Sequence, residues 1–340
     1  MRWMGWMVVV GWLSAAPAWA GRWTEDDFLN KALRTEPYAM VASKDPARAN
    51  TMIGSVRQYT PVKGDTFLDL ARFYGLGFNE IEQANPGIDQ WIPALKTSTV
   101  TLPTAWIIPQ GPHIGVVVNI PEMRLYYFHP HRTGVPQLVT TYPVGLGRDE
   151  WRTPQGKFKV LGKTQYPTWV IPESIRREHI KERGDHRRVI KGGAPDNPLG
   201  KYRLELTMPG YRIHGTDIPW GVGMQVSHGC VRLYPEDIEV LYPLVPIGAP
   251  GEFLYRPVKI GARDGRIYAE VSPDIYKLLP DLFGEAQGLV VEHGWQQWVD
   301  VEKLRRAVET QDGIPTDVTV GEAPLTPANG APRPGRREPL

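Results

Sequence analysis

The sequence predicts a mainly β protein with a small βααβ unit ahead of its largest domain. Residues 114–120 form a largely apolar run, and residues 123–127 alternate apolar and polar side chains, which indicates a buried strand and its hairpin partner. Upstream, residues 57–104 place two short helical segments between two strand-like segments. A chain of 340 residues is long enough to contain both parts.

The composition is that of an ordinary folded protein. Hydrophobic residues make up 41% of the chain and charged residues 22%, and the formal net charge is only +2. A protein that binds nucleic acid through its charge would show a strong basic bias. We therefore expect no nucleic-acid partner.

Residues 1–20 have the pattern of a secretion signal. Arg2 gives a positive start, residues 3–13 are apolar and uncharged, and residues 18–20 read Ala-Trp-Ala, which fits a small-x-small cleavage site. The alternative is an uncleaved membrane anchor, but a spanning helix needs about 20 apolar residues. We predict cleavage near Gly21, an exported protein and no membrane span.

Composition shifts divide the rest of the chain into six parts. They are a polar N-terminal segment with a short helix over residues 28–33, the βααβ unit, a linker, the main domain, a C-terminal β/helical appendage and a disordered tail. Their predicted bounds are 21–56, 57–104, 105–111, 112–257, 258–320 and 321–340.

The main domain and the appendage carry further predicted elements. Two glycine-rich loops, 145–156 and 184–200, are long enough to serve a site, although they can equally be solvated connections. The helices of the appendage are candidates for a lid. The expected strands are 137–144, 157–162, 202–207, 211–213, 252–255 and 266–271, and the expected helices are 172–183, 235–242, 273–279 and 301–310.

The βααβ unit carries a recognisable set of residues. They are Tyr59, Val62, Gly64-Asp65-Thr66, Leu70-Ala71, Tyr74, Ile81, Ala84-Asn85-Pro86 and Val100-Thr101-Leu102-Pro103. Thr66 is suited to cap the first helix, which we expect to end near Tyr74-Gly75. On these residues the unit resembles a LysM module, which implies binding of glycans that contain N-acetylglucosamine, including peptidoglycan. The alternative is a degenerate module that only packs against its neighbour.

Cys230 is the only cysteine of the chain. Exported proteins usually pair cysteines in disulfides, so a lone one is an inert buried residue, a partner for another chain or a reactive thiol. The thiolate is the nucleophilic form, and a nearby histidine lowers the thiol pKa from its ordinary value of about 8.5. His228 and His214 precede Cys230 in the sequence. These three residues are also zinc-competent, but no fourth ligand is evident, and we predict no metal.

The local spacing suggests how these residues meet. In an extended segment His228 and Cys230 share a face, because side chains alternate along a strand. Gly229 between them lets backbone amides approach a ligand, where they can stabilise an oxyanion. His214 belongs to another strand and is the better candidate for the base that takes the thiol proton.

Two motifs give the main domain a family resemblance. Ile213-His214-Gly215-Thr216 and Ser227-His228-Gly229-Cys230-Val231-Arg232-Leu233, with Gly221-Val222-Gly223 between them, resemble the core of the L,D-transpeptidases (YkuD domain, ErfK/YbiS type). The resemblance runs from about residue 115 to 257 and implies a YkuD-like β-sandwich with a few helices. The family's usual pattern has Asn two residues after the cysteine, whereas this chain has Arg232.

The resemblance implies a role for each motif residue. Cys230 is the expected nucleophile and His214 its general base. His228 is expected to help shape the oxyanion and acceptor site, and the backbone amides of Gly229 and Cys230 to donate to the oxyanion. No aspartate can be assigned as the group that orients His214, and in this family a backbone carbonyl can take that part. Ser227 and Arg232 are expected to order the loop or to contact a substrate carboxylate, and for Arg232 a purely structural ion pair stays open. The expected substrate-binding residues are Ser227, Arg232, Thr216 and Gly223.

The implied enzyme is periplasmic and acts on peptidoglycan without a metal or organic cofactor. Cys230 would attack the L,D-peptide bond of a tetrapeptide stem ending in meso-diaminopimelate and D-alanine, release D-alanine and form a thioester. The acceptor would be an amine of a second stem, giving a 3–3 cross-link, or the C-terminal lysine of an outer-membrane lipoprotein. With water as acceptor, the enzyme would be an L,D-carboxypeptidase or an amidase. An inactive wall-binding protein is the alternative of a different class.

Overall fold

The computed structural model describes residues 23–29, 36–95 and 99–325. The predicted secretion signal and residues 326–340 of the predicted tail lie outside these residues. In the described part of the chain no helix is long and apolar enough to cross a bilayer.

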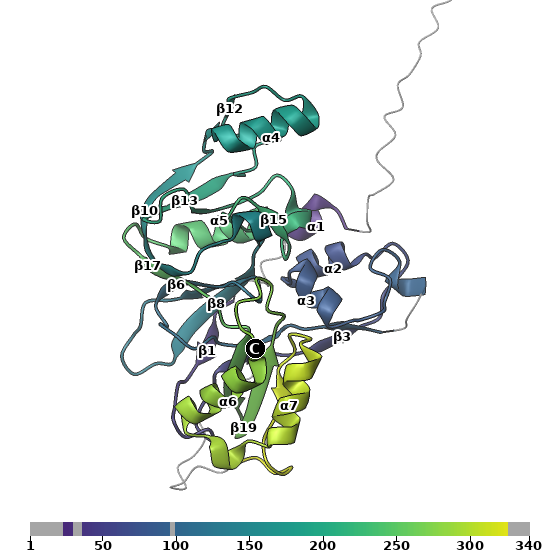
Figure 1. The fold of residues 1–340 in the computed structure, drawn as a ribbon, viewed down its shortest axis with the longest axis vertical. Helices are drawn as coiled ribbons and strands as arrows, with labels where there is room; N and C mark the ends of the chain where they lie inside the picture. Colours follow the sequence, from purple (N-terminus) through teal and green to yellow (C-terminus); the bar gives the residue numbers. More distant parts are fainter. Residues whose placement is uncertain (1–22, 30–35, 96–98, 326–340) are drawn as a thin grey trace, which may run out of the picture.

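A nine-stranded mixed sheet forms the centre of the molecule and confirms the mainly β prediction (Figure 1). Its strands are β1 (Tyr38–Met40), β6 (Gly115–Asn119), β7 (Arg124–Phe128), β8 (Gln137–Pro143), β10 (Gly156–Gln165), β13 (Tyr202–Leu206), β14 (Arg212–His214), β16 (Val231–Arg232) and β17 (Pro250–Leu254). The order across the sheet is β1-β8-β7-β6-β17-β10-β13-β14-β16. Two neighbouring pairs, β17 with β6 and β14 with β16, are parallel, and the other pairs are antiparallel.

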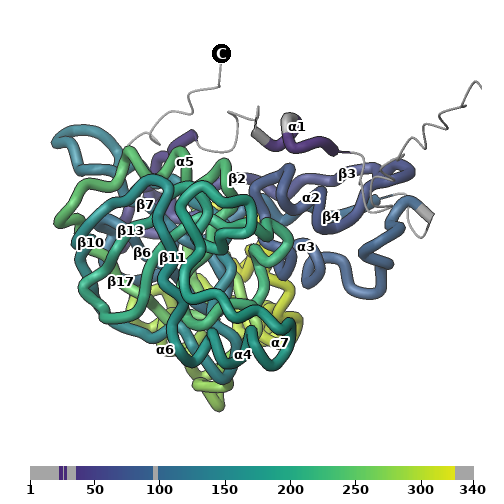
Figure 2. The backbone as a smooth tube through the Cα atoms, turned by 90° about the horizontal axis from the view of Figure 1, so that it is seen from above, coloured from purple at the N-terminus to yellow at the C-terminus, as the bar shows by residue number. Residues whose placement is uncertain are grey.

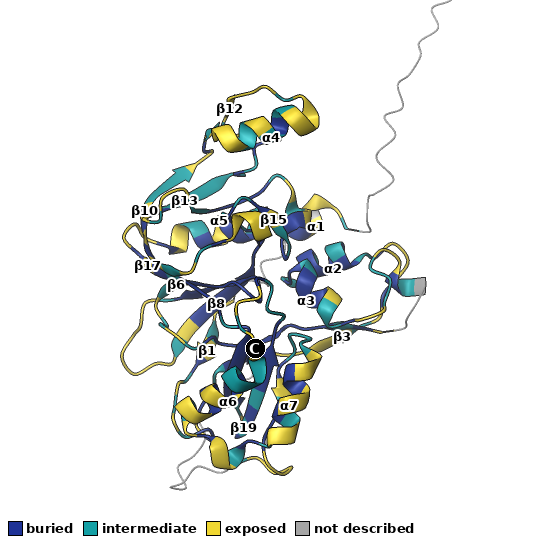
Figure 3. Cartoon of the chain, in the orientation of Figure 1, coloured by how far each residue is buried: buried dark blue, intermediate teal, exposed yellow. Residues whose placement is uncertain are grey.

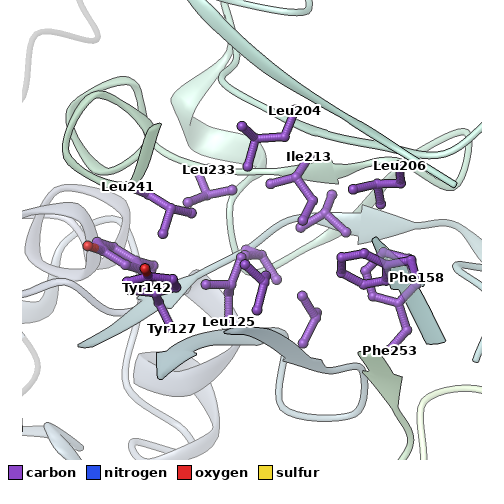
Figure 4. Packing of buried hydrophobic residues seen from close by; sticks show 14 of the residues in the cluster. Leu125, Tyr127, Tyr142, Phe158, Leu204, Leu206, Ile213, Leu233, Leu241 and Phe253 are labelled. Atoms are coloured by element: carbon purple, nitrogen blue, oxygen red, sulfur yellow. The ribbon is translucent and has the colours of Figure 1, made fainter. Parts of the chain in front are cut away.

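The two halves of this sheet share one apolar core. Val118 of β6 and Leu125 of β7 belong to the same buried cluster as Leu204 of β13 and Ile213 of β14. Figure 4 shows Leu204 and Ile213 on one side of this core and Leu125 on the other, with Leu241 of helix α5 (Pro235–Leu244) beside them. The sheet therefore curves so that its halves lie as two layers, and β14 and β16 end the second layer.

The predicted βααβ order is found in the βααβ unit. Its elements are β3 (Arg57–Tyr59), α2 (Phe67–Tyr74), α3 (Phe78–Gln83) and β4 (Val100–Leu102), with β3 and β4 antiparallel. Thr66 caps α2 as predicted, since its hydroxyl accepts from the Asp69 N–H at 3.2 Å. Gly75 ends the helix with a left-handed φ of 67°. Figure 2 shows the unit beside the main sheet.

The βααβ unit shares a buried core with the main sheet. Its residue Leu70 belongs to one cluster with Val117 and Tyr126, whose neighbours in sequence face the opposite layer. A buried ion pair crosses the same interface, since Arg124 of β7 donates to Glu80 of α3 at 2.6 Å. Side chains alternate along strands, so the unit covers the second face of β6 and β7.

Residues 105–111, predicted as a linker, contain a strand instead. β5 (Ala105–Ile107) is buried and pairs antiparallel with β2 (Met52–Gly54). The prediction was wrong because the partner strand lies in the polar N-terminal segment, far away in sequence. That segment also supplies β1 of the main sheet and the helix α1 (Glu25–Leu29), which begins before the predicted helix does.

The C-terminal appendage is a three-stranded sheet packed against two helices. Its elements are β18 (Val258–Arg263), β19 (Arg266–Val271), α6 (Leu282–His293), α7 (Val301–Thr310) and β20 (Thr316–Asp317). The predicted helix over residues 273–279 is wrong, because the Asp274 carboxylate accepts from the backbone N–H groups of Leu278 and Leu279 and folds the segment into turns. Helix α7 has its predicted bounds, and α6 was not predicted.

An insertion between β10 and β13 stands out from the sheet. It consists of β11 (Trp169–Val170), α4 (Glu173–Arg183) and β12 (Val189–Ile190), with β11 and β12 antiparallel. Figure 3 shows that most of α4 is exposed. The remaining short elements are the strands β9 (Leu146–Gly147) and β15 (Gln225–Ser227) and the 3-10 turns Pro93–Leu95, Asp149–Trp151, Pro219–Gly221 and Gln296–Trp298.

Candidate active site

Parallel pairing of β14 with β16 brings the two sequence motifs together. His214 lies opposite Arg232 in the register, and the Leu233 N–H donates to the His214 carbonyl at 2.9 Å. Cys230 directly precedes β16. The predicted base, nucleophile and arginine therefore come from neighbouring strands at the edge of the sheet.

These residues line a cavity of about 740 Å³. Cys230, His214 and His228 contribute to its wall, and helix α4 contributes the opposite part with residues such as Glu178 and Glu182. No residue of 273–312 lines it. The C-terminal helices therefore do not border the cavity as a lid would, whereas the β10–β13 insertion contributes to its wall.

His214 is buried and held by its neighbour's backbone. Its Nδ1 lies 2.6 Å from the Gly215 carbonyl oxygen, which can only accept, so Nδ1 carries the hydrogen. The lone pair is then on Nε2, as a general base requires. Burial, followed by the positive charge of Arg232, lowers the pKa of His214 to about 3. The imidazole is consequently neutral at physiological pH, and a backbone carbonyl orients it.

Cys230 is partly buried beside two arginines. Burial raises the pKa of its thiol, while the charges of Arg212 and Arg232 oppose this shift. The sulfur lies 3.8 Å from the Gly210 carbonyl oxygen, to which the thiol donates. Since its raised pKa keeps the thiol protonated at neutral pH, the resting cysteine and histidine are both neutral.

The loop before Cys230 is held by its own serine. Ser227 is 1% exposed, its hydroxyl donates to the Cys230 carbonyl at 2.6 Å, and it accepts from the Gly229 N–H at 3.1 Å. Ser227 therefore orders the loop, one of its two predicted roles, and it also borders the cavity. The Gly229 amide is engaged within the loop and not open to an oxyanion, which corrects its predicted role.

Residues 145–156 brace this loop from the other side. β9 pairs in parallel with β15, and the Thr153 hydroxyl donates to the Gly229 carbonyl at 3.0 Å. Tyr276 of the C-terminal appendage donates to the Gly147 carbonyl at 2.8 Å. The loop thus serves the site, and the appendage supports it without lining the cavity.

Two groups of opposite charge in the cavity wall have unmatched polar atoms. Arg232 Nε and Asp217 Oδ1 are both buried, and neither has a hydrogen-bond partner among the residues that the structure describes. Both residues line the cavity. The two charges offset each other, but a buried polar atom without a hydrogen bond is costly, so each atom is suited to a polar group of a bound molecule. Asp217 was not predicted, since a lone aspartate after the His-Gly-Thr motif carries no recognisable signal.

Thr216 and Gly223 have other roles than the predicted contact with substrate. The Thr216 hydroxyl exchanges hydrogen bonds with the backbone of Ile218 and forms a turn. A Cβ on Gly223 would lie 2.2 Å from the Phe78 nitrogen, so this glycine permits close packing against the βααβ unit. Neither residue lines the cavity, which corrects both predictions.

Helix α4 and the 145–156 loop supply side chains that the sequence analysis missed. Glu178 accepts from His228 Nε2 at 2.7 Å and from Arg148 at 2.6 Å, and the Trp151 ring packs edge-on against His228 at 5.4 Å. The loop and the helix were predicted as elements. Only the tertiary packing shows which of their side chains reach the cavity.

Comparison with known proteins identifies relatives that match most of the chain. Residues 114–260 match the model of the L,D-transpeptidase catalytic domain, YkuD. The probable L,D-transpeptidase YcfS of Escherichia coli K12 is 31% identical over 302 residues, which cover 82% of this chain and 92% of that protein. The probable L,D-transpeptidase YbiS of the same organism is 36% identical over 66% of this chain and 73% of its own. A solved L,D-transpeptidase from Mycobacterium smegmatis is 21% identical, over 44% of this chain and 61% of its own, with a TM-score of 0.31.

Proposed function

The chain belongs to the L,D-transpeptidase family, and from that premise we propose a reaction path in which Cys230 and His214 cleave a peptidoglycan stem peptide. His214 Nε2 takes the thiol proton as the sulfur attacks the carbonyl of the L,D-peptide bond. The C–S bond forms, the C–N bond breaks, and His214 returns the proton to the amine of the departing D-alanine. The product is a thioester on Cys230.

The observation that carries this proposal is the hydrogen bond from His214 Nδ1 to the Gly215 carbonyl, in a residue that shares its cavity with Cys230. It leaves Nε2 as the basic nitrogen. The neutral resting pair suits a mechanism in which the proton moves only as the donor carbonyl arrives. For the oxyanion we assign the backbone amide of Cys230, because Ser227 engages that of Gly229.

Arg232 is the proposed contact for a carboxylate of the donor stem. Its unmatched Nε supports this role, and Asp217 in the same wall is suited to an ammonium group. A stem that ends in meso-diaminopimelate and D-alanine offers both kinds of group. The acceptor amine then attacks the thioester, and it comes from a second stem or from the C-terminal lysine of a lipoprotein. With water in its place the same acyl-enzyme would be hydrolysed.

The remaining parts of the chain fit a protein of the cell wall. We propose that residues 1–20 direct export to the periplasm. The βααβ unit is the candidate LysM module, and large exposed side chains at Val62, Trp91 and Ile92 would provide apolar contacts for sugar rings. The shared core with the main sheet also supports the alternative, in which the unit only packs against its neighbour.

Acylation by a carbapenem tests the nucleophile. We expect the intact chain to gain the mass of the antibiotic and Cys230→Ala to show no adduct, because the thiolate is the only sulfur nucleophile of the chain. A chain that sediments with peptidoglycan but never forms the adduct would be a wall-binding protein and not an enzyme of this mechanism.

Purified muropeptides test the reaction itself. Incubation with tetrapeptide stems, with and without a lipoprotein C-terminal peptide, should give cross-linked or peptide-linked products in the mass spectrum. Tripeptides alone would mean that water is the acceptor, and the transferase proposal would then be wrong.

A further inference from the structure

Glu178 ties helix α4 to the loop that carries the nucleophile. Its Oε2 lies 2.7 Å from His228 Nε2, and its Oε1 lies 2.6 Å from the Arg148 guanidinium. The three side chains are 19–34% exposed, so water screens the charges only in part. His228 is separated from Cys230 by Gly229 alone. A residue of the insertion is thus connected directly to the catalytic loop.

The contact with Glu178 assigns a hydrogen to Nε2 of His228, because a carboxylate can only accept and lies 2.7 Å from this nitrogen. Hydrogen bonds from Arg148 and His228 lower the pKa of Glu178, which is therefore ionised at neutral pH. The Arg148 guanidinium also lies 2.9 Å from His228 Nε2, but it can only donate, so it donates to the carboxylate and not to this nitrogen. The nitrogen that remains for proton transfer in neutral His228 is Nδ1.

In the proposed transfer reaction, one proton of the acceptor amine does not pass through His214. An amine acceptor arrives as an ammonium ion and must lose one proton before it attacks the thioester. A second proton leaves the nitrogen as the C–N bond forms and the C–S bond breaks, and through His214 it restores the Cys230 thiol. His228 lines the same cavity and is the candidate base for the first proton.

We propose that Glu178 positions His228 as the base that takes this first proton. The carboxylate occupies Nε2, which leaves Nδ1 as the ring nitrogen that can take a proton, as a carboxylate behind a catalytic histidine does. The ammonium proton passes to Nδ1 of His228 and from there to solvent. This inference rests on the proposed function, and it makes Glu178 a positioning residue and not a catalytic one.

A structural role for Glu178 predicts a different pattern. If the carboxylate only fastened α4 to the body, its loss would slow the reaction with every nucleophile alike. If it serves proton removal, its loss would matter only for acceptors that arrive protonated. Hydroxylamine is largely neutral at neutral pH, whereas a lysine side chain is not, so the two acceptors separate these roles.

The test uses the full chain with Glu178→Gln and the control Glu173→Gln. Glu173 is exposed on the same helix, forms surface ion pairs with Arg176 and Arg177, and does not line the cavity. Carbapenem acylation reports the first half of the reaction. Decay of the acyl-enzyme formed from a tetrapeptide stem, on addition of a lysine peptide or of hydroxylamine, reports the second half.

For Glu178→Gln we expect an unchanged carbapenem acylation rate and a loss of about 10-fold or more in decay with the lysine peptide. Decay of Glu178→Gln with hydroxylamine and all three rates of Glu173→Gln should stay within about twofold of the intact chain. Equal losses with the lysine peptide and hydroxylamine, or no loss with either, would overturn the role of Glu178 and leave the transferase proposal standing. An intact chain whose acyl-enzyme reacts with neither nucleophile would overturn both.

Discussion

At the scale of single residues, burial shifts the pKa values of Cys230 and His214 in opposite directions. Burial raises the pKa of the thiol and lowers that of the imidazole, so both resting groups are uncharged. Transfer of a proton between them creates two charges in a poorly solvated site. The enzyme can therefore hold its nucleophile inactive until a donor carbonyl can accept the developing negative charge.

The depressed pKa of His214 gives a testable acid sensitivity. An unfolded histidine titrates near 6.5, and the folded one titrates at about 3. Between these pH values the unfolded chain binds more protons than the folded chain does. The contribution of His214 to folding stability is therefore fully present above about pH 6.5, and it decreases by up to about 1.4 kcal/mol for each pH unit below that value. Urea unfolding across this range should show a shallower decline for His214→Asn than for the intact chain.

A matched control separates this effect from general acid unfolding. His186 is exposed on the insertion, so His186→Asn should decline as steeply as the intact chain does. If His214→Asn also declines with the unaltered slope, the buried imidazole is not the group that couples stability to pH.

The residues of the motif could be predicted from sequence, but their neighbours could not. Cys230 and His214 follow from a lone thiol, the two histidines and a family resemblance. Glu178 lies far from His228 in sequence and Arg148 farther still, and charged residues on exposed helices are common. Only the fold brings these two side chains to the same imidazole, and the sequence analysis therefore missed them.

At the scale of elements, the sequence predicted helix ends correctly where the residues that determine them lie within one turn. Helix α2 begins after Thr66 and ends at Gly75, as predicted, because capping acts within one turn. The failures have non-local causes. β5 exists because β2 pairs with it, and the turns after Pro273 exist because the Asp274 carboxylate takes backbone N–H groups that a helix would need.

The ion pair between α3 and β7 is the strongest candidate for a single destabilising change. Arg124 is 0% exposed, and Glu80 accepts both from it and from Trp106 Nε1 at 2.7 Å. Glu80→Ala leaves a buried guanidinium without its carboxylate, which costs about 3–5 kcal/mol. We expect a corresponding fall in the urea midpoint, whereas Glu82→Gln on the exposed side of the same helix should change it little. A midpoint that Glu80→Ala leaves unchanged would show that this pair does not hold the interface.

At the scale of the whole molecule, the parts predicted as separate domains are joined by shared cores. The cluster around Leu70 and Ile81 includes Val117 and Tyr126 of the main sheet. The C-terminal appendage is joined too, because Lys259 of β18 lies between Glu122 and Glu270 in a buried charge cluster. Sequence patterns give the order of such parts, but they do not show which apolar faces pack together.

Truncation tests how far the residues before the main domain support it. A chain of residues 112–325 lacks the βααβ unit, β1 and the β2–β5 pair, exposes the outer face of β6 and β7 and leaves Arg124 without Glu80, so we expect it to aggregate or to melt well below the full chain. A chain of residues 23–325 keeps the shared core and should melt like the full chain in circular dichroism. Equal melting temperatures for the two truncated chains would mean that the unit is an independent module.

The neutral state of Cys230 also affects how long each molecule survives chemically. Peroxide attacks the thiolate far more readily than the thiol, and the sulfenic acid that results is normally rescued by a second cysteine. This chain contains one cysteine, so it has no resolving partner of its own, and an oxidised sulfur cannot form an internal disulfide. The burial that keeps the proton on Cys230 therefore protects the nucleophile from oxidative loss between turnovers.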